Sequence, residues 1–196
     1  MSHNPYEPIP ALALLDARRS VPAKQLGEPA PDEATLMRML ESAVRVPDHG
    51  KLTPWRFLAI RGDARRALGD RLAARGLERD PDAGDAAVEK DRMRFSHAPL
   101  VLVVVAQLGP HAKIPEQERL LSAGCVCFAL LQAAQALGFG AQWLTGWPAY
   151  DSEVKHWFGL GEHERVVGFI HIGTPKLEAP ERERPDPRGM FAEWTP

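Results

Sequence analysis

Two arginines and a serine stand side by side near the start of the chain, at Arg18, Arg19 and Ser20. Planar guanidinium groups bind phosphate oxygens in pairs and a serine hydroxyl donates one further hydrogen bond, so the triplet suits a phosphate group. The competing interpretation is structural, because arginines at the C-terminus of a helix complement its dipole. The triplet alone leaves both interpretations open.

A second polar group runs from Arg45 to His49 (RVPDH), just after a predicted helix. Asp48 and His49 are of the types that act as general acid or base. Adjacent side chains rarely face the same way, however, and a turn held by Asp48 explains the pattern equally well. None of the seven histidines occurs in an H-E-x-x-H or similar array, so we predict no metal site. We assign no catalytic residue from the sequence.

Two common enzyme classes are disfavoured by their motifs. Gly138 and Gly140 lack the third glycine of a dinucleotide fingerprint and follow a helix, whereas that fingerprint follows a strand. Ser20 and Ser122 lack a G-x-S-x-G context, which argues against a serine hydrolase.

The elements that position these groups are organised around the apolar stretch 122–147. Its helical part, from Ser122 to Gly138, has almost no polar face, so we expect a helix that is buried on all sides. About 16 residues are too few to cross a bilayer, so the cover must be protein, part of which a second copy could supply. Gly138 fits the C′ position of this helix, and residues 141–147 have strand character.

The remaining elements predict an α+β fold. We expect further helices over 11–19, 32–46, 64–76, 85–95 and 151–158, and strands over 55–60, 98–106 and 165–172. The continuous β-branched run at 98–106 predicts a central strand covered on both faces. Because the order lacks regular βαβ alternation, we expect an α+β or three-layer arrangement with helices on both sides of the sheet. The tail over 173–196 has five prolines yet ends in aromatic residues, so we expect it to dock on another surface.

The composition is that of an ordinary globular domain, with 44% hydrophobic and 26% charged residues among 196. We expect a single domain over 1–196. The net charge of −2 gives no reason to expect nucleic acid or a membrane as a partner. Cys125 and Cys127 point in different directions on one helix and cannot bridge, which fits a reducing cytoplasm. Residues 1–20 lack a basic n-region, so we predict no signal peptide and a cytoplasmic protein.

Taken together and in order, the motifs resemble the FMN-dependent nitroreductases, and within them the short, minimal branch. The matching pieces are RRS at 18–20, EPAP at 28–31, RVPDH at 45–49 with Pro54-Trp55 behind it, SAGC at 122–125, GFG at 138–140, Trp143 with Gly146, and VGF at 167–169 leading into Gly173-Thr174-Pro175. They span about residues 11–176, so the ordered set is far more specific than any one motif.

This resemblance implies a central, mostly antiparallel sheet flanked by helices in an obligate homodimer, with two FMN sites shared between subunits and the tail over 173–196 docked on the dimer. It implies that Arg18, Arg19 and Ser20 hold the flavin phosphate and ribityl chain. Arg45 and His49 would reach the flavin of the partner subunit. The stretch Trp143, Leu144 and Thr145 would line the flavin from the other side.

The same resemblance implies nicotinamide contacts at the helix end, from Ala133, Ala134, Gln135, Ala136, Leu137 and Gly138. One departure concerns the cation that many relatives carry two residues after the serine: this chain has Pro22 there, with Lys24 shifted beyond it. Arg19 and Arg45 are then the sequence candidates for stabilising negative charge on the reduced flavin.

The implied activity is ping-pong hydride transfer from NAD(P)H to FMN and then to a nitroaromatic, a quinone or another small acceptor. Two alternatives stay open: a protein that stores or senses FMN without turnover, and a dimerisation module that has lost the cofactor. Steady-state NAD(P)H consumption separates the first alternative from the enzyme, and protein that takes up no FMN would indicate the second.

Overall fold

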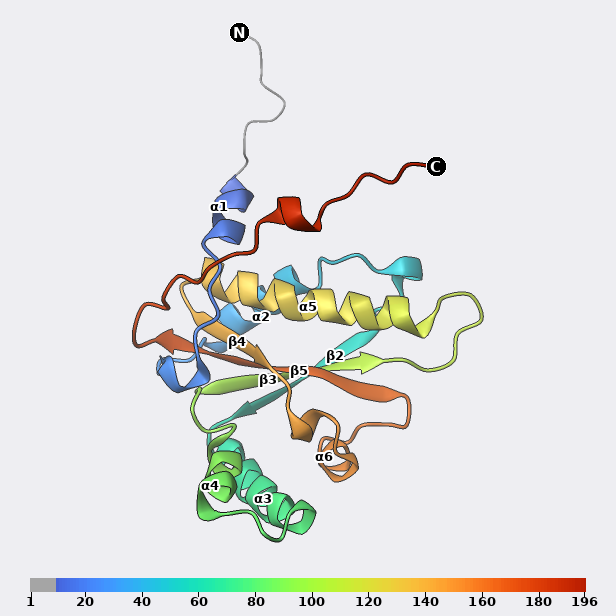
Figure 1. Ribbon diagram of the computed structural model, residues 1–196. Helices are drawn as coiled ribbons and strands as arrows, with labels where there is room; N and C mark the ends of the chain where they lie inside the picture. The colour runs from blue at the N-terminus through green and yellow to red at the C-terminus, as the bar shows by residue number, and fades with distance from the viewer. Residues whose placement is uncertain (1–9) are drawn as a thin grey trace.

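A five-stranded antiparallel sheet forms the middle of the molecule in the computed structural model, which describes residues 10–196 (Figure 1). The strands are β1 (Leu26–Gly27), β2 (Trp55–Arg61), β3 (Leu100–Gln107), β4 (Gly140–Leu144) and β5 (Glu164–Pro175). Their order is β1-β5-β3-β2, and β4 also pairs with β5. We predict no signal peptide in residues 1–20. The first nine of these residues lie outside the described part of the chain.

Helices cover both faces of the sheet. They are α1 (Pro10–Asp16), α2 (Glu33–Ala43), α3 (Asp63–Arg79), α4 (Asp85–Met93), α5 (Glu116–Ala136) and α6 (Ser152–Trp157), with short 3₁₀-helices over Ala23–Gln25, His49–Lys51, Trp147–Ala149 and Pro187–Met190. In Figure 1, α2 and α5 lie on one face of the sheet and α3, α4 and α6 lie on the other. The predicted α+β, three-layer fold is therefore confirmed.

Strand β3 joins the two cores because its side chains alternate between the faces. Leu100, Leu102 and Val104 pack with α2 and α5, whereas Val101 and Val103 pack on the other face, with α3 and α6. This strand is buried along its length up to its last residue, as the continuous β-branched run predicts.

Local signals placed three helix ends correctly. The Asp32 carboxylate accepts a hydrogen bond from the Thr35 N–H at 2.8 Å, which caps α2. Asp151 accepts from the N–H groups of Glu153 and Val154 and caps α6 in the same way. Gly138 follows α5 with φ +84°, the left-handed conformation expected of a C′ glycine.

Two predictions about helices were wrong. The helix over 11–19 ends at Asp16, so the Arg18-Arg19-Ser20 triplet follows it in irregular chain instead of forming its last turn. Helix α5 begins at Glu116 and has 21 residues, because the polar residues before the apolar run continue the helix. By length and composition alone α5 could therefore cross a membrane; its packing against the sheet identifies it as a core helix.

The cover around α5 is also incomplete within one chain. Ala123, Val126 and Leu130 are buried in the core, but Leu121 is 61% exposed and Phe128 is 42% exposed. The all-round burial that we predict is thus absent in a single chain. The apolar pattern indicates how much of the helix surface has to be covered, and one chain covers only part of that surface.

The tail does not dock within the chain either. It follows the body as far as Glu181, which pairs with Arg19, and Arg184, which donates to the Arg18 carbonyl at 3.3 Å. Beyond that point it runs away from α5 (Figure 1), and Trp194 is 85% exposed. Docking of the tail on another surface stays a prediction.

Candidate functional site

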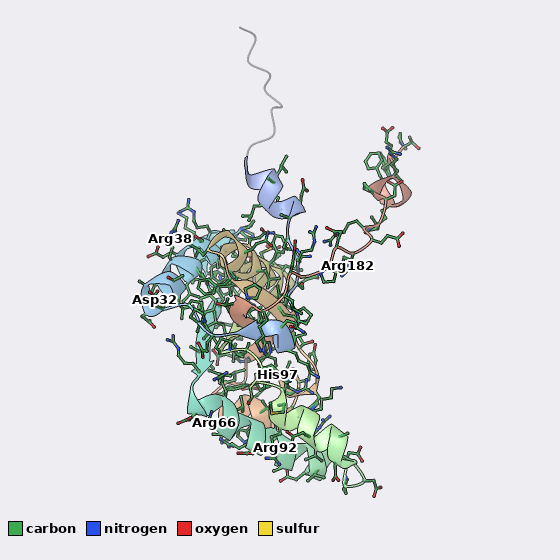
Figure 2. All side chains as sticks on the ribbon, turned by 90° about the vertical axis from the view of Figure 1, so that its left-hand side faces the viewer. Asp32, Arg38, Arg66, Arg92, His97 and Arg182 are labelled. Atoms are coloured by element: carbon green, nitrogen blue, oxygen red, sulfur yellow. The ribbon has the colours of Figure 1, made fainter. Side chains whose placement is uncertain are left out.

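Four arginines gather where the tail passes the end of α1. Arg18 donates to the Ser20 hydroxyl at 3.2 Å, and burial, followed by the charges of Arg184, Arg182 and Arg19, lowers the pKa of Arg18. Figure 2 shows Arg182 on the tail segment beside this region. A cavity of about 460 Å³ lies here, lined by Leu15, Asp16, Arg18, Glu181, Arg182 and Arg184. Mutual repulsion among these guanidinium groups would be relieved by a bound anion.

Arg19 points into a different environment. Its guanidinium donates to the carbonyls of Asp16 at 2.8 Å and Arg18 at 3.0 Å and pairs with Glu181. Its backbone N–H donates to the Gln135 side chain of α5 at 3.3 Å. The guanidinium of Arg19 is already held by the chain, so Arg18 is the freer of the two for a phosphate.

The segment after the triplet is fixed along strand β4. The Val21 N–H donates to the Ala141 carbonyl at 3.0 Å, and the Ala23 N–H donates to the Gln142 side chain at 2.6 Å. These bonds place Ser20 and Lys24 beside the edge of β4, so a ligand held at Arg18 can extend along this strand.

A second cavity, of about 290 Å³, lies farther along the same segment. It is lined by Pro22, Ala23, Lys24, Lys90, Arg94, His97, Gln142 and Leu144. In Figure 2, His97 lies between Arg182 on the tail and Arg92 on α4. Lys90 lies on α4, Arg94 follows its end, and His97 lies in the bend beyond it. The sequence suggests that residues 77–97 cover the cleft and shape the acceptor, but their composition does not single out these three side chains.

Both histidines near this cavity have a lowered pKa. Burial, followed by the charges of Lys24 and Lys176, lowers the pKa of His97. Below it, His171 on β5 is fully buried against Phe95, with ring centroids 5.9 Å apart. Burial, then His97 and Arg94, lower the pKa of His171 to about 4. The other basic side chains that line this cavity are Lys24, Lys90 and Arg94.

The predicted flavin-lining stretch is divided by the pleat of β4. Leu144 lines the cavity, but Trp143 points to the opposite face, where its indole N–H donates to the Val167 carbonyl at 3.3 Å. Gly168 lies against this indole, and any Cβ there would collide with it. Thr145 follows the strand and is partly exposed. The three residues therefore form one segment but not one surface.

Arg45 and His49 lie far from Arg18. Both are exposed in the loop after α2, and His49 Nδ1 lies 2.7 Å from the Glu118 carboxylate on α5. The Ser122 hydroxyl donates to the Pro47 carbonyl at 2.8 Å and fixes the same loop. Asp48 accepts from the N–H groups of Leu52 and Thr53, so its role is the structural turn that we considered as the alternative.

The distance between the two groups follows from the length of α5. Arg19 is bonded to Gln135 at one end of this helix, and His49 contacts Glu118 near the other. Seventeen residues separate these contacts, which corresponds to about 25 Å along the axis of a helix. One chain therefore does not bring the two predicted groups together.

The residues predicted to contact nicotinamide also separate. Ala133 and Ala134 are buried in the core, and Ala136 and Leu137 are exposed elsewhere. Gln135 and Gly138 line a cavity of about 460 Å³ beside Arg19 and Glu181. Within residues 10–196 there is no cluster of three or more His, Cys, Asp or Glu side chains that could hold a metal ion.

Comparison with known proteins identifies a family that shares this sequence and architecture. A sequence model described as the Nitroreductase family matches residues 15–174. The chain is 38% identical over 169 residues to the putative NAD(P)H nitroreductase YdjA of Escherichia coli K12, covering 86% of this chain and 90% of that one. It is 39% identical over 174 residues to a putative NAD(P)H nitroreductase of Haemophilus influenzae, covering 88% and 92%.

Solved structures agree on the fold. A nitroreductase-like protein from Bacillus cereus superimposes with a TM-score of 0.79 at 20% identity, over 98% of both chains. A nitroreductase with bound FMN from Bacteroides fragilis gives 0.72 at 20% identity, over 96% of this chain and all of that one. The resemblance inferred from the ordered motifs is confirmed: the chain belongs to the nitroreductase family.

Proposed function

We propose that this oxidoreductase is FMN-dependent, accepts hydride from NADH or NADPH, and passes it to a nitroaromatic, a quinone or another small acceptor in a ping-pong cycle. The observation that carries the proposal is the line of groups along β4, from the arginines around Arg18, past Ser20, to the cationic cavity at Lys24. FMN has a phosphate at one end, a polyhydroxyl chain in the middle and an electron-poor ring at the other end. This order matches the order of the protein groups along β4.

The phosphate end of FMN fits the arginine cluster. Arg18 with Ser20, joined by Arg182 and Arg184 of the tail, would bind the phosphate oxygens. This assignment gives the tail arginines a role. Burial, followed by the charges of Arg184, Arg182 and Arg19, lowers the pKa of Arg18, and a bound phosphate would offset the repulsion among these charges.

The ring end fits the cavity at β4. Bound FMN supplies the atom that accepts and returns the hydride, and its reduced form carries negative charge. Lys24, Lys90 and Arg94 would stabilise that charge electrostatically, in place of the cation lost at Pro22. They are better placed for this than Arg19, whose guanidinium is already paired. Leu144 and Thr145 would line the ring, and Gln142 would fix the segment beneath it.

Arg45 and His49 can join this site only from a second copy, because they lie about 25 Å along α5 from Arg19. A two-fold axis across α5 would bring the His49 end of one subunit to the Arg19 end of the other. The exposed apolar side chains support such a homodimer. They include Leu12 and Leu15 on α1, Met37 on α2 and Val44 just after it, and Leu121, Phe128 and Leu137 on or just after α5, elements that Figure 1 shows on one side of the sheet.

The protein side chains would bind and orient the cofactor, and the cofactor would perform the redox step. No side chain of the described site is positioned as a dedicated acid, so water would supply the proton for a nitro acceptor. Among the six residues at the helix end, Gln135 and Gly138 have surface available to a nicotinamide. Two relatives by structure support the cofactors: the FMN-bound nitroreductase of Bacteroides fragilis and an FMN and NADPH-dependent nitroreductase from a Sphingopyxis strain.

The test is spectroscopic. Protein reconstituted with FMN and freed of excess should be yellow, bleach anaerobically with NADH or NADPH, and recover its colour with a nitroaromatic. Flavin that stays yellow with both nicotinamides would support the storage or sensing protein instead. Colourless protein that takes up no FMN would support the dimerisation module.

A further inference from the structure

One carboxylate ties helix α4 to the loop that follows β4. The Asp91 carboxylate accepts from the Trp147 indole N–H, at 3.0 Å and 3.1 Å to its two oxygens. It also accepts from the Arg94 guanidinium at 2.7 Å. The side chains of Asp91 and Arg94 are only 14% and 20% exposed. Removing one partner of a shielded ion pair leaves the other charge uncompensated, so each charge depends on the other.

Two glycines leave the space that this pair occupies. Gly146 has φ +86°, and a Cβ built there would lie 2.9 Å from a terminal nitrogen of Arg94. A Cβ built on Gly76 of α3 would lie 2.8 Å from a carboxylate oxygen of Asp91. The Arg94 guanidinium is therefore held on one side by Asp91 and bounded on another by the backbone at Gly146.

The pair stands at the edge of the cavity at β4. Arg94 lines this cavity together with Lys24 and Lys90, and no carboxylate is among the lining residues. Within residues 10–196, Asp91 is the carboxylate that pairs with a basic side chain of this cavity. Asp91 therefore decides both where the Arg94 guanidinium lies and how much of its charge the cavity receives.

We propose that Asp91 is a positioning residue of the flavin site, which holds Arg94 at the end of β4 and offsets part of its charge. In this way Asp91 sets how strongly the cavity favours the reduced, negatively charged form of FMN over the oxidised form. This inference rests on the proposed function, in which the ring end of FMN lies in the cavity at β4.

Asp91→Asn separates the charge of Asp91 from its hydrogen bonds. One oxygen of Asp91 accepts from both Arg94 and Trp147, and an amide oxygen in the same place can keep both bonds. With the carboxylate charge gone, Arg94 is no longer offset. The midpoint potential of bound FMN should rise, with at least a threefold change in the ratio of its affinities for the reduced and oxidised cofactor. This corresponds to about 15 mV, since a tenfold change is about 30 mV for a two-electron couple.

Arg94→Gln should move the potential in the opposite direction by a similar amount, because it removes the cation and keeps the Asp91 carboxylate. The double variant Asp91→Asn/Arg94→Gln restores the net charge of the pair and should return the potential close to that of the parent. A merely structural role would not give shifts of opposite sign. Glu89→Gln is the matched control, since it removes an exposed carboxylate of α4 that pairs with Arg92, and it should leave the potential unchanged.

The potential is measured by anaerobic equilibration with a redox dye, which needs no nicotinamide, and urea unfolding of the FMN-free proteins checks that each variant folds. A shift that is missing from either folded variant, or shifts of the same sign, would overturn the proposal. If Asp91→Asn alone does not fold, the double variant decides: adding Asp91→Asn to Arg94→Gln should raise the potential by the same threefold ratio, and no rise would overturn the proposal.

The parent protein separates this inference from the proposed function. A parent that binds FMN and is reduced by NADH or NADPH, with variants whose potentials do not move as expected, would contradict the role of Asp91 alone. A parent that takes up no FMN would contradict the proposed function and the role of Asp91 with it.

Discussion

The two faces of the sheet differ in how completely one chain covers them. On the face with α3, α4 and α6, Asp151 pairs with Arg75 at 3.1 Å, and Asp91 accepts from the Trp147 indole at 3.0 Å and from Arg94 at 2.7 Å. On the face with α2 and α5, more of the large apolar side chains stay exposed, among them Met37, Leu121 and Phe128. One chain therefore covers the first face, here called the complete face, more fully than the second, here called the incomplete face; a second copy covering the incomplete face is part of the proposed function.

Placing a charge on the incomplete face should have the largest effect. Phe128→Asp would put a carboxylate without a partner within the proposed interface, where desolvation costs several kcal/mol. We expect loss of the dimer and, with it, loss of tightly bound FMN, measured by ultracentrifugation and by the flavin absorbance of the purified protein.

The matched control lies on the complete face. Leu77 on α3 is 41% exposed against 42% for Phe128, so Leu77→Asp introduces the same charge at a side chain of similar exposure. It should leave the dimer and FMN content unchanged. Equal losses from both variants would show that the difference between the faces has no bearing on assembly.

Removing core volume from the complete face should lower stability without affecting assembly. Leu72→Ala, at a side chain of α3 with no exposure, would leave a cavity and should lower the free energy of unfolding by about 2–5 kcal/mol. Denaturant unfolding measures this, and the dimer dissociation constant should change less than twofold. A large change in that constant would mean that the two faces are coupled.

Much of the fold could be predicted because its signals are local. The β-branched run predicts the buried β3, Asp32 and Asp151 cap the helices that follow them, and Gly138 ends α5. The errors came where a local signal was incomplete. The apolar run at 122–138 concealed the polar first turns of α5, and the arginines at 18–19 suggested a helix end that the chain reaches at Asp16.

The site was only partly predictable, because its assembly depends on distances that a sequence does not contain. The ordered motifs indicated Arg18, Ser20 and Leu144; the first two precede a segment that is hydrogen-bonded to β4, and Leu144 ends that strand. The separation of Arg45 from Arg18 became evident only from the length of α5 and from where its flanking loops are fixed. Lys90 lay in a segment whose composition indicated only an exposed helix.

Removing one charge from the incomplete side should affect ligand retention more than stability. Arg18→Ala should weaken FMN binding by about 1.5–3 kcal/mol, the value of a charge-assisted hydrogen bond. Arg66→Ala on α3 removes the same charge from the complete face, where Arg66 pairs with Asp63 on its own helix, and should leave FMN binding unchanged. Fluorescence titration of FMN measures both. Unchanged retention in Arg18→Ala would show that the phosphate lies elsewhere.

Acidification should produce the smallest effect, through a histidine of the complete face that lies beneath the cationic cavity. Because the pKa of His171 is about 4 in the folded chain and 6.5 as its ordinary value, the unfolded chain binds the extra proton between these values. Stability should therefore fall as the pH decreases from about 6.5 to 4. A shift of this size corresponds to about 3 kcal/mol at most, and relaxation around the charge should reduce the loss to about 1–2 kcal/mol.

His171→Phe should keep the stacking on Phe95 and flatten this part of the pH profile, as measured by unfolding in urea at a series of pH values. Glu164 serves as an internal reference, because Arg56 lowers its pKa to about 2 and its loss of stabilisation falls in a more acidic window. If the variant loses as much stability as the parent between pH 6.5 and 4, another group carries the titration. In that case His171 does not contribute to the loss of stability between pH 6.5 and 4, and the acid sensitivity of the complete face comes from its carboxylates alone.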